Sequence, residues 1–209
     1  MLPDSALRIA ALVLLLAGFQ QSGQGLVIQA KAYLAPVLIE RAWDETRAEG
    51  IVTKPWYWAD TWPVARLQVP SQDVELMVLS GDSGNTLAFG PGHSPASAIL
   101  GSQGLAVIGG HRDTHFSFLQ NLQFGEPIYL ELADGRRQEY RVDGIDVVDS
   151  DRQRLPASRA TEQLLLVTCY PFDTLQAGGA LRYVVSASPM APSRAPVDPP
   201  PKRSRFYQL

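Results

Sequence analysis

Short apolar or alternating runs, separated by turn residues, fill the sequence from Val64 to about Ser188. Each run has the length of a β-strand, and pairs of residues such as Asp-Gly punctuate them. Many short strands with no long helix between them predict an antiparallel sandwich or a closed barrel. The predicted strands are Val64–Val69, Val74–Leu79, Leu105–Ile108, Ile128–Leu132, Tyr140–Val142, Leu164–Val167 and Tyr183–Val185, with turns at 81–82, 90–92, 134–135 and 143–144.

The remaining patterns and the composition exclude several classes. Phe116 to Leu122 has the pattern of a short helical turn, and no Gly-rich nucleotide-binding motif follows a predicted strand. The chain of 209 residues carries 18 Lys and Arg against 21 Asp and Glu, which leaves no basic footprint for nucleic acid. Its single cysteine excludes an intramolecular disulfide and a Cys-rich zinc site.

The first 50 residues have the pattern of a targeting element. Arg8 precedes eleven uncharged residues, Ile9 to Phe19, which is the length of a signal-peptide apolar region rather than of a full membrane span. Apolar character resumes at Leu26 and recurs at helical spacing to about Trp43. The apolar residues of that stripe are Leu26, Ala30, Tyr33, Leu34, Val37 and Leu38.

We therefore expect residues 1–50 to form an uncleaved signal anchor and amphipathic helix, with the β-domain outside the cytoplasm at the cell membrane. Two alternatives stay open. In the first, the segment is a signal peptide that is cleaved, which leaves a periplasmic or secreted protein. In the second, the segment is a buried core helix of a soluble protein.

Two further segments flank the β-domain. Residues 51–63 contain three of the four tryptophans together with prolines, and we expect this Pro/Trp-rich segment to pack on the following domain. Residues 189–209 are rich in proline and basic side chains, and we expect a disordered tail.

Cys169 ends the most apolar predicted strand and precedes Tyr170 and Pro171. A strand that ends in a turn holds its last side chain firmly and leaves space for a substrate, which suits a nucleophile. A buried structural cysteine is the alternative. An unpaired thiol is unusual in an exported protein, and this favours the functional interpretation.

His111 follows Gly109 and Gly110 just after another predicted strand. An imidazolium beside a thiol lowers the thiol pKa, and the same imidazole can protonate a leaving amine. The alternatives are a loop-capping histidine or a metal ligand paired with His115, which would need a helix that Asp113 and Thr114 do not favour. Arg182 begins the last predicted strand and is suited to stabilise an oxyanion, although taken alone it reads as a surface residue.

Taken together, Gly110-His111-Arg112 after one strand, Leu166 to Cys169 at the end of another and Arg182 opening the next resemble the sortases. These are membrane-anchored cysteine transpeptidases. The resemblance runs from about Lys54 to Ser188 and includes Gly90-Pro91-Gly92-His93, followed by Gly101 to Gly104. The runs Gly-His-Arg-Asp-Thr-His-Phe and Thr-Cys-Tyr-Pro-Phe, with the Pro/Trp-rich segment, are most similar to the proteobacterial-type sortases.

The resemblance implies an all-β fold: a closed eight-stranded barrel with short helices over residues 64–188, preceded by the N-terminal helix. It also implies that Cys169 is the nucleophile, His111 the general acid and Arg182 the clamp for the oxyanion or substrate. Thr168 matches a position that touches substrate. His93 is a candidate to line the site.

One departure from the family pattern is visible. The pattern Thr-Leu-x-Thr-Cys reads Leu165 to Cys169 here, so the first threonine is absent. His115 is expected to be structural. The acidic cluster that binds calcium in the family is not found in this sequence, so we assign no metal, and no cofactor is expected.

The implied function is cleavage of a C-terminal LPxTG-like sorting signal through a thioacyl enzyme, followed by transfer of the substrate protein to an amine acceptor. One alternative is a cell-envelope cysteine peptidase that hydrolyses the acyl enzyme. Papain-like enzymes place Cys before His, the reverse of the order here, and the Ser-His-Gly-Cys text of L,D-transpeptidases is absent. The other alternative is a non-catalytic, membrane-tethered β-barrel binding module.

Overall fold

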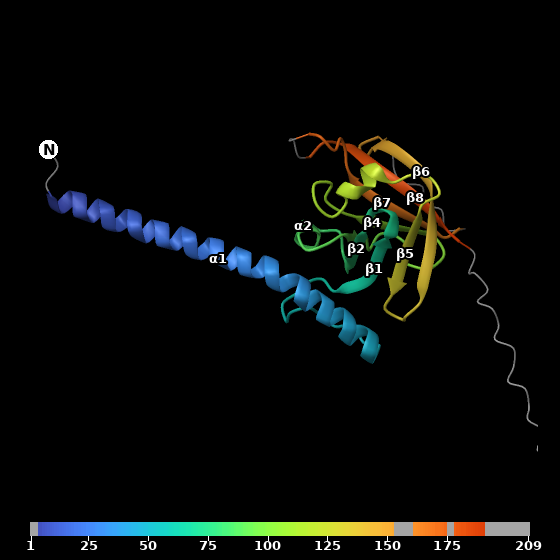
Figure 1. Cartoon of the computed structure of the whole chain (residues 1–209), viewed down its shortest axis with the longest axis horizontal. Coiled ribbons are helices and arrows are strands. Elements are labelled where there is room, and N and C mark those ends of the chain that lie inside the picture. Colours follow the sequence, from blue (N-terminus) through green and yellow to red (C-terminus); the bar gives the residue numbers. More distant parts are fainter. Residues whose placement is uncertain (1–3, 153–160, 175–177, 191–209) are drawn as a thin grey trace, which may run out of the picture.

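A closed β-barrel with one long N-terminal helix makes up the protein (Figure 1). The computed structural model describes residues 4–152, 161–174 and 178–190. The strands are β1 (Pro63–Val69), β2 (Val74–Ser80), β3 (Gly92–His93), β4 (Leu105–Gly109), β5 (Pro127–Leu132), β6 (Arg137–Asp149), β7 (Gln163–Cys169) and β8 (Leu181–Pro189). The helices are α1 (Asp4–Glu49), α2 (Gly84–Leu87) and the 3-10 turns η1 (Pro70–Gln72) and η2 (Ser117–Asn121).

The sheet closes in the order β1-β2-β3-β4-β7-β8-β6-β5, with β5 returning to pair with β1. This confirms the predicted all-β class and selects the barrel over the sandwich. Most neighbours are antiparallel, whereas β2 with β3 and β4 with β7 are parallel. The predicted helical turn at 116–122 is the 3-10 turn η2. The two-residue strand β3 was not predicted, because it is too short for a periodic signal.

Alternating side chains fill the barrel. Along β1 the buried positions are every second residue, from Pro63 to Val69, as expected for a strand with one face in the core. Leu67, Leu130 and Leu166 are fully buried members of one cluster that occupies the interior. This interior gives the barrel wall a rigid base for the residues at its strand ends.

The predicted turn at residues 143–144 is wrong. Strand β6 runs through it, and its register with β8 shifts between Val142 and Gly144, which marks a β-bulge. A Cβ at Gly144 would lie 2.2 Å from the hydroxyl of Ser186 on β8, so the glycine here allows close approach rather than a reversal of the chain. The Asp-Gly pair at 134–135 does form the β5–β6 turn, with Gly135 at φ 84°.

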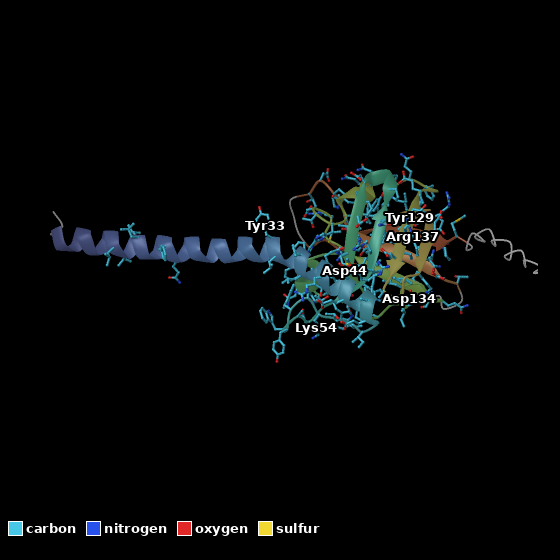
Figure 2. The ribbon with its side chains drawn as sticks, turned by 60° about the horizontal axis from the view of Figure 1, so that its bottom comes forward. Tyr33, Asp44, Lys54, Tyr129, Asp134 and Arg137 are labelled. Atoms are coloured by element: carbon cyan, nitrogen blue, oxygen red, sulfur yellow. The ribbon has the colours of Figure 1, made fainter. Side chains whose placement is uncertain are left out.

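Helix α1 ends at Glu49, beyond the predicted end near Trp43. The side chains that it buries against the barrel are Ala35, Ile39, Ala42, Trp43 and Thr46, which recur at helical spacing. The apolar spacing correctly predicted a helix here, but Tyr33, Leu34 and Val37 of that stripe are exposed and do not form the face that packs on the barrel. Figure 2 shows Tyr33 directed away from the barrel. The face that packs on the barrel consists mainly of small residues around Trp43. A hydropathy pattern does not identify such a face, because small residues contribute little to it.

Ion pairs fasten the carboxyl-terminal half of α1 to the barrel. Arg47 contacts Glu131 of β5 at 2.7 Å, and Arg66 of β1 pairs with Glu40. The amino-terminal half extends away from the barrel, as Figure 1 shows. Within the described residues, no helix combines the length and the apolarity that crossing a membrane requires.

The Pro/Trp-rich segment 51–63 covers the barrel beside β2. The Thr61 hydroxyl donates a 2.7 Å hydrogen bond to the Ser80 carbonyl, and the ring of Trp56 meets Phe89 edge to face with centroids 5.2 Å apart. Tyr57 and Trp58 are exposed. At the other end, β8 extends to Pro189. The predicted disordered tail otherwise lies at 191–209, outside the described residues.

Candidate active site

Three neighbouring strands bring His111, Cys169 and Arg182 to one level of the barrel wall. In the parallel pair β4–β7, Gly109 is the register partner of Val167. His111 and Cys169 each lie two residues beyond this pair, so His111 follows the end of β4 at the level where Cys169 ends β7. In the antiparallel pair β7–β8, Cys169 is the register partner of Arg182. Adjacent strands lie about 4.8 Å apart, which puts the three backbones side by side.

The alternation of side chains places Cys169 on the outer face of the barrel. Leu164 and Leu166 of β7 belong to the interior cluster, whereas Leu165 and Val167, which share the face of Cys169, belong to a separate apolar cluster. Arg182 shares its face with Val184 of the same outer cluster. The cluster consists of Leu105, Leu165 and Val184, packed with Val107, Val148 and Val167. The thiol, which is partly exposed, therefore lies next to an outer apolar cluster whose central members, Leu105, Leu165 and Val184, are buried.

Thr168 points the other way, into the barrel. Its side chain is 3% exposed, and its hydroxyl donates a 2.7 Å hydrogen bond to the carbonyl of Gly110. The amide of Gly110 donates in turn to the Val167 carbonyl at 3.1 Å. Both polar groups of Gly110 thus bind β7, and this fixes the start of the His111 loop.

The loop that carries His111 is built around a buried phenylalanine. The amide of Phe116 donates to the His111 carbonyl at 2.9 Å, which folds residues 111–116 into a compact turn. A Cβ on Gly110 would lie 2.8 Å from the ring of Phe116, so this position requires glycine. The imidazole of His111 is exposed at the surface of this turn.

Sequence reasoning missed Arg112 as a functional candidate. Its side chain is 8% exposed; Nη1 donates to the Pro171 carbonyl and Nη2 to the Thr174 carbonyl, both at 2.7 Å. The available signal was an arginine directly after the candidate histidine. Its partners lie about 60 residues away in sequence, and no local pattern points to them.

Two other predicted site residues, Arg182 and His93, bind backbone carbonyls of the protein itself. Nη1 of Arg182 donates to the carbonyls of Gly179 and Leu181, the latter at 2.9 Å. A guanidinium carries five N–H donors, so these bonds do not exhaust it. His93 lies on β3, and its Nε2 contacts the Ala98 carbonyl of the following loop at 2.9 Å.

His115 is half-buried beside the site. Burial lowers the pKa of His115 below its ordinary value, and the nearby charge of His111 lowers that pKa further. No group of three or more His, Cys, Asp or Glu side chains is placed to hold a metal ion among the residues that the structure describes. The arrangement at Cys169 instead offers a thiol, an imidazole and a guanidinium, the components of acyl transfer through a thioester.

A family model for the sortase domain matches residues 67–190, which is more than half of the chain and includes all of these positions. The chain belongs to the sortase family. Sortase D of Bacillus subtilis is 31% identical over 120 residues; the match covers 57% of this chain and 60% of that relative, so the chain spans less than two thirds of its length.

Solved sortase structures have the same fold. Sortase A from Corynebacterium diphtheriae is 29% identical with a TM-score of 0.58, covering 68% of this chain and 66% of that one. A sortase D5 transpeptidase from Clostridium perfringens has a TM-score of 0.61 at 20% identity, covering 76% of this chain and 99% of that one. These sortases are from Gram-positive bacteria and do not support the narrower expectation of a proteobacterial-type sortase.

Proposed function

We propose that this sortase domain is a cysteine transpeptidase that cleaves a C-terminal LPxTG-like sorting signal and transfers the substrate protein to an amine acceptor. The observation that carries the proposal is the pairing of Cys169 with Arg182 across β7 and β8, with His111 two residues beyond the end of β4, the parallel neighbour of β7. A nucleophile, a proton donor and a cation at one level of a rigid sheet form the set that acyl transfer requires.

The proposed reaction has two halves. The Cys169 thiolate attacks the scissile carbonyl carbon, and the oxyanion that forms accepts hydrogen bonds from the Arg182 guanidinium. When the intermediate collapses, the C–N bond breaks, His111 protonates the leaving amine and a thioester remains. A second amine then attacks the thioester, which forms the new amide bond and releases Cys169 as the thiolate. The proton that the attacking amine loses returns to His111.

The outer apolar cluster suits the substrate at its partly exposed members. Leu165 and Val184 are buried, whereas Val167, two residues before Cys169, is only partly buried and leaves apolar surface beside the thiol. An LPxTG-like signal presents leucine and proline ahead of the scissile bond, and apolar side chains of this kind gain by leaving water. The predicted substrate contacts of Thr168 and His93 stay predictions, because in the free chain both side chains contact backbone carbonyls of the protein itself.

The N-terminal segment is the proposed membrane tether. The described side chains of Leu12, Val13, Leu14, Leu15 and Phe19 are all exposed on the half of α1 that extends from the barrel. We infer an uncleaved signal anchor with the barrel outside the cytoplasm. The double substitution Leu14→Lys with Leu15→Lys should release the protein from alkali-washed membranes, and unchanged retention would refute the anchor.

Trapping the acyl enzyme tests the transpeptidase. Incubation with LPxTG-like peptides should raise the intact mass of the protein by the acyl fragment, and the adduct should be absent from Cys169→Ala with the circular dichroism spectrum unchanged. Adding an amine should convert the adduct to a ligated product. Normal turnover by Cys169→Ala would overturn the mechanism. Hydrolysis despite excess amine would instead identify a peptidase.

A further inference from the structure

Arg112 joins the loop that carries His111 to the turn that follows Cys169. It follows His111 directly, and its two terminal nitrogens each donate a 2.7 Å hydrogen bond to carbonyls of the turn after Cys169, those of Pro171 and Thr174. Its Nε donates to the Asp113 carboxylate at 3.0 Å. One side chain therefore spans from the His111 loop to the Cys169 turn.

The chemistry of this contact depends on a guanidinium. A buried charge is unfavourable unless it is paired and hydrogen-bonded, and Arg112 meets this condition with one carboxylate and two carbonyls. The guanidinium is planar and its donors form a rigid fork, so it holds both carbonyls at a fixed spacing. A lysine in its place would keep the charge but present a single flexible ammonium.

The turn that Arg112 holds is otherwise anchored by aromatic packing. The ring of Phe172 packs edge to face on Tyr183 with centroids 5.1 Å apart, and Tyr170 stacks on the same ring at 6.1 Å. These contacts fix the turn to β8. Thr168 and Val167 bind the start of the His111 loop through Gly110, and Arg112, the residue after His111, binds directly to the turn.

We propose that Arg112 is a positioning residue of this site, which sets the distance and orientation of the His111 imidazole relative to the Cys169 thiol. The inference rests on the proposed transpeptidase for its catalytic consequence. A displacement of about 1 Å in a reacting pair lowers the rate by about 100-fold, so loss of the fork should act on kcat rather than on substrate affinity.

The lone cysteine provides a readout that needs no substrate. Alkylation of native protein with iodoacetamide reports on Cys169 alone, because the chain has one cysteine, and the thiolate is the reactive form. The rate should be followed against pH in wild type, Arg112→Gln, Arg112→Lys and His111→Ala. Arg136→Gln is the matched control, since that arginine is exposed and pairs with Asp134 two residues away in the β5–β6 turn.

The dependence of the alkylation rate on pH in Arg112→Gln should move toward that of His111→Ala, whereas Arg136→Gln should match wild type. With a peptide substrate, kcat of Arg112→Gln should fall by about 10- to 100-fold while KM stays within about twofold. Arg112→Lys should fail to restore the wild-type profile. Circular dichroism establishes that each variant is folded. If Arg112→Gln does not fold, the alkylation profile and kcat of Arg112→Lys test the positioning role.

A wild-type profile in the folded Arg112 variants would overturn the positioning role, as would full rescue by lysine of both the profile and kcat. The proposed function fails differently. If wild type forms no acyl adduct with any sorting peptide, the transpeptidase is refuted, while the alkylation profiles still decide whether Arg112 couples His111 to Cys169.

Discussion

The hydroxyl of Thr168 donates a 2.7 Å hydrogen bond to the carbonyl of Gly110, joining the residue before Cys169 to the residue before His111. Arg112 makes the corresponding connection between the residue after His111 and the turn that follows Cys169. The candidate nucleophile and the candidate acid are thus held together on both sides. Each connection can be removed separately by a single substitution.

Thr168→Val should destabilise the barrel while nearly preserving its shape. The substitution leaves the Gly110 carbonyl without its donor, and an unsatisfied buried acceptor costs about 1–3 kcal/mol. Urea denaturation measures the loss in the free energy of unfolding, and acyl-enzyme formation should slow in the same variant. Thr168→Ser keeps the hydroxyl and should retain most of the activity. If valine and serine variants lose activity equally, the hydrogen bond is not the cause.

Gly110→Ala and Gly109→Ala should differ sharply although the residues are adjacent. A Cβ at Gly110 would lie 2.8 Å from the Phe116 ring, whereas a Cβ at Gly109 meets no atom within 4 Å. Phe116 is fully buried and has little room to shift. Overpacking of this kind costs about 1–3 kcal/mol. Thermal denaturation should show a lower Tm for Gly110→Ala and a Tm near wild type for Gly109→Ala; equal values would contradict the steric argument.

His115 should make stability depend on pH. Its pKa in the folded protein lies below the ordinary value of about 6.5. The unfolded chain therefore binds a proton more readily than the folded protein does. His115 leaves the free energy of unfolding independent of pH above pH of about 6.5, and this free energy falls as the pH drops through the folded-state pKa. Urea denaturation from about pH 8 to pH 5 measures it. His115→Gln should show a shallower loss of stability, and an identical slope would rule His115 out as the source.

Trp43→Ala should weaken the attachment of α1 to the barrel. The indole is fully buried, and truncation of a buried Trp costs about 3–5 kcal/mol. The free energy of unfolding and the protease sensitivity of α1 measure the effect. Tyr33→Ala, on the same helix but 78% exposed, should leave both unchanged. Equal effects of the two substitutions would mean that α1 is not held through its tryptophan.

The elements with local signals were predictable. Seven runs of apolar residues became strands of the barrel, and Cys169 does end a strand, since strand ends depend on nearby residues. The Asp143-Gly144 pair misled the prediction because the same dipeptide serves in turns and in bulges. Its use here depends on Ser186, which approaches Gly144 from β8.

The contacts that assemble the site were not predictable in this way. Arg112 and Thr168 bind carbonyls about 60 residues away, and those contacts exist because β4 and β7 are parallel neighbours. Nothing local specifies that register. The resemblance to sortases supplied the candidate catalytic residues, whereas the hydrogen bonds that connect the His111 loop with β7 and the turn after Cys169 depend on the three-dimensional fold.

Closure of the barrel has a consequence for recognition. Many proteins bind extended peptides by adding them as a further strand to the edge of a sheet. Because the barrel closes, β7 and β8 are each paired on both sides within the described residues, so neither offers a free edge to which a peptide can add next to Cys169. A peptide that reaches Cys169 must be read by outward side chains and by the loops around them. Its selectivity can therefore change by loop substitution alone, without any change in the hydrogen-bonded framework.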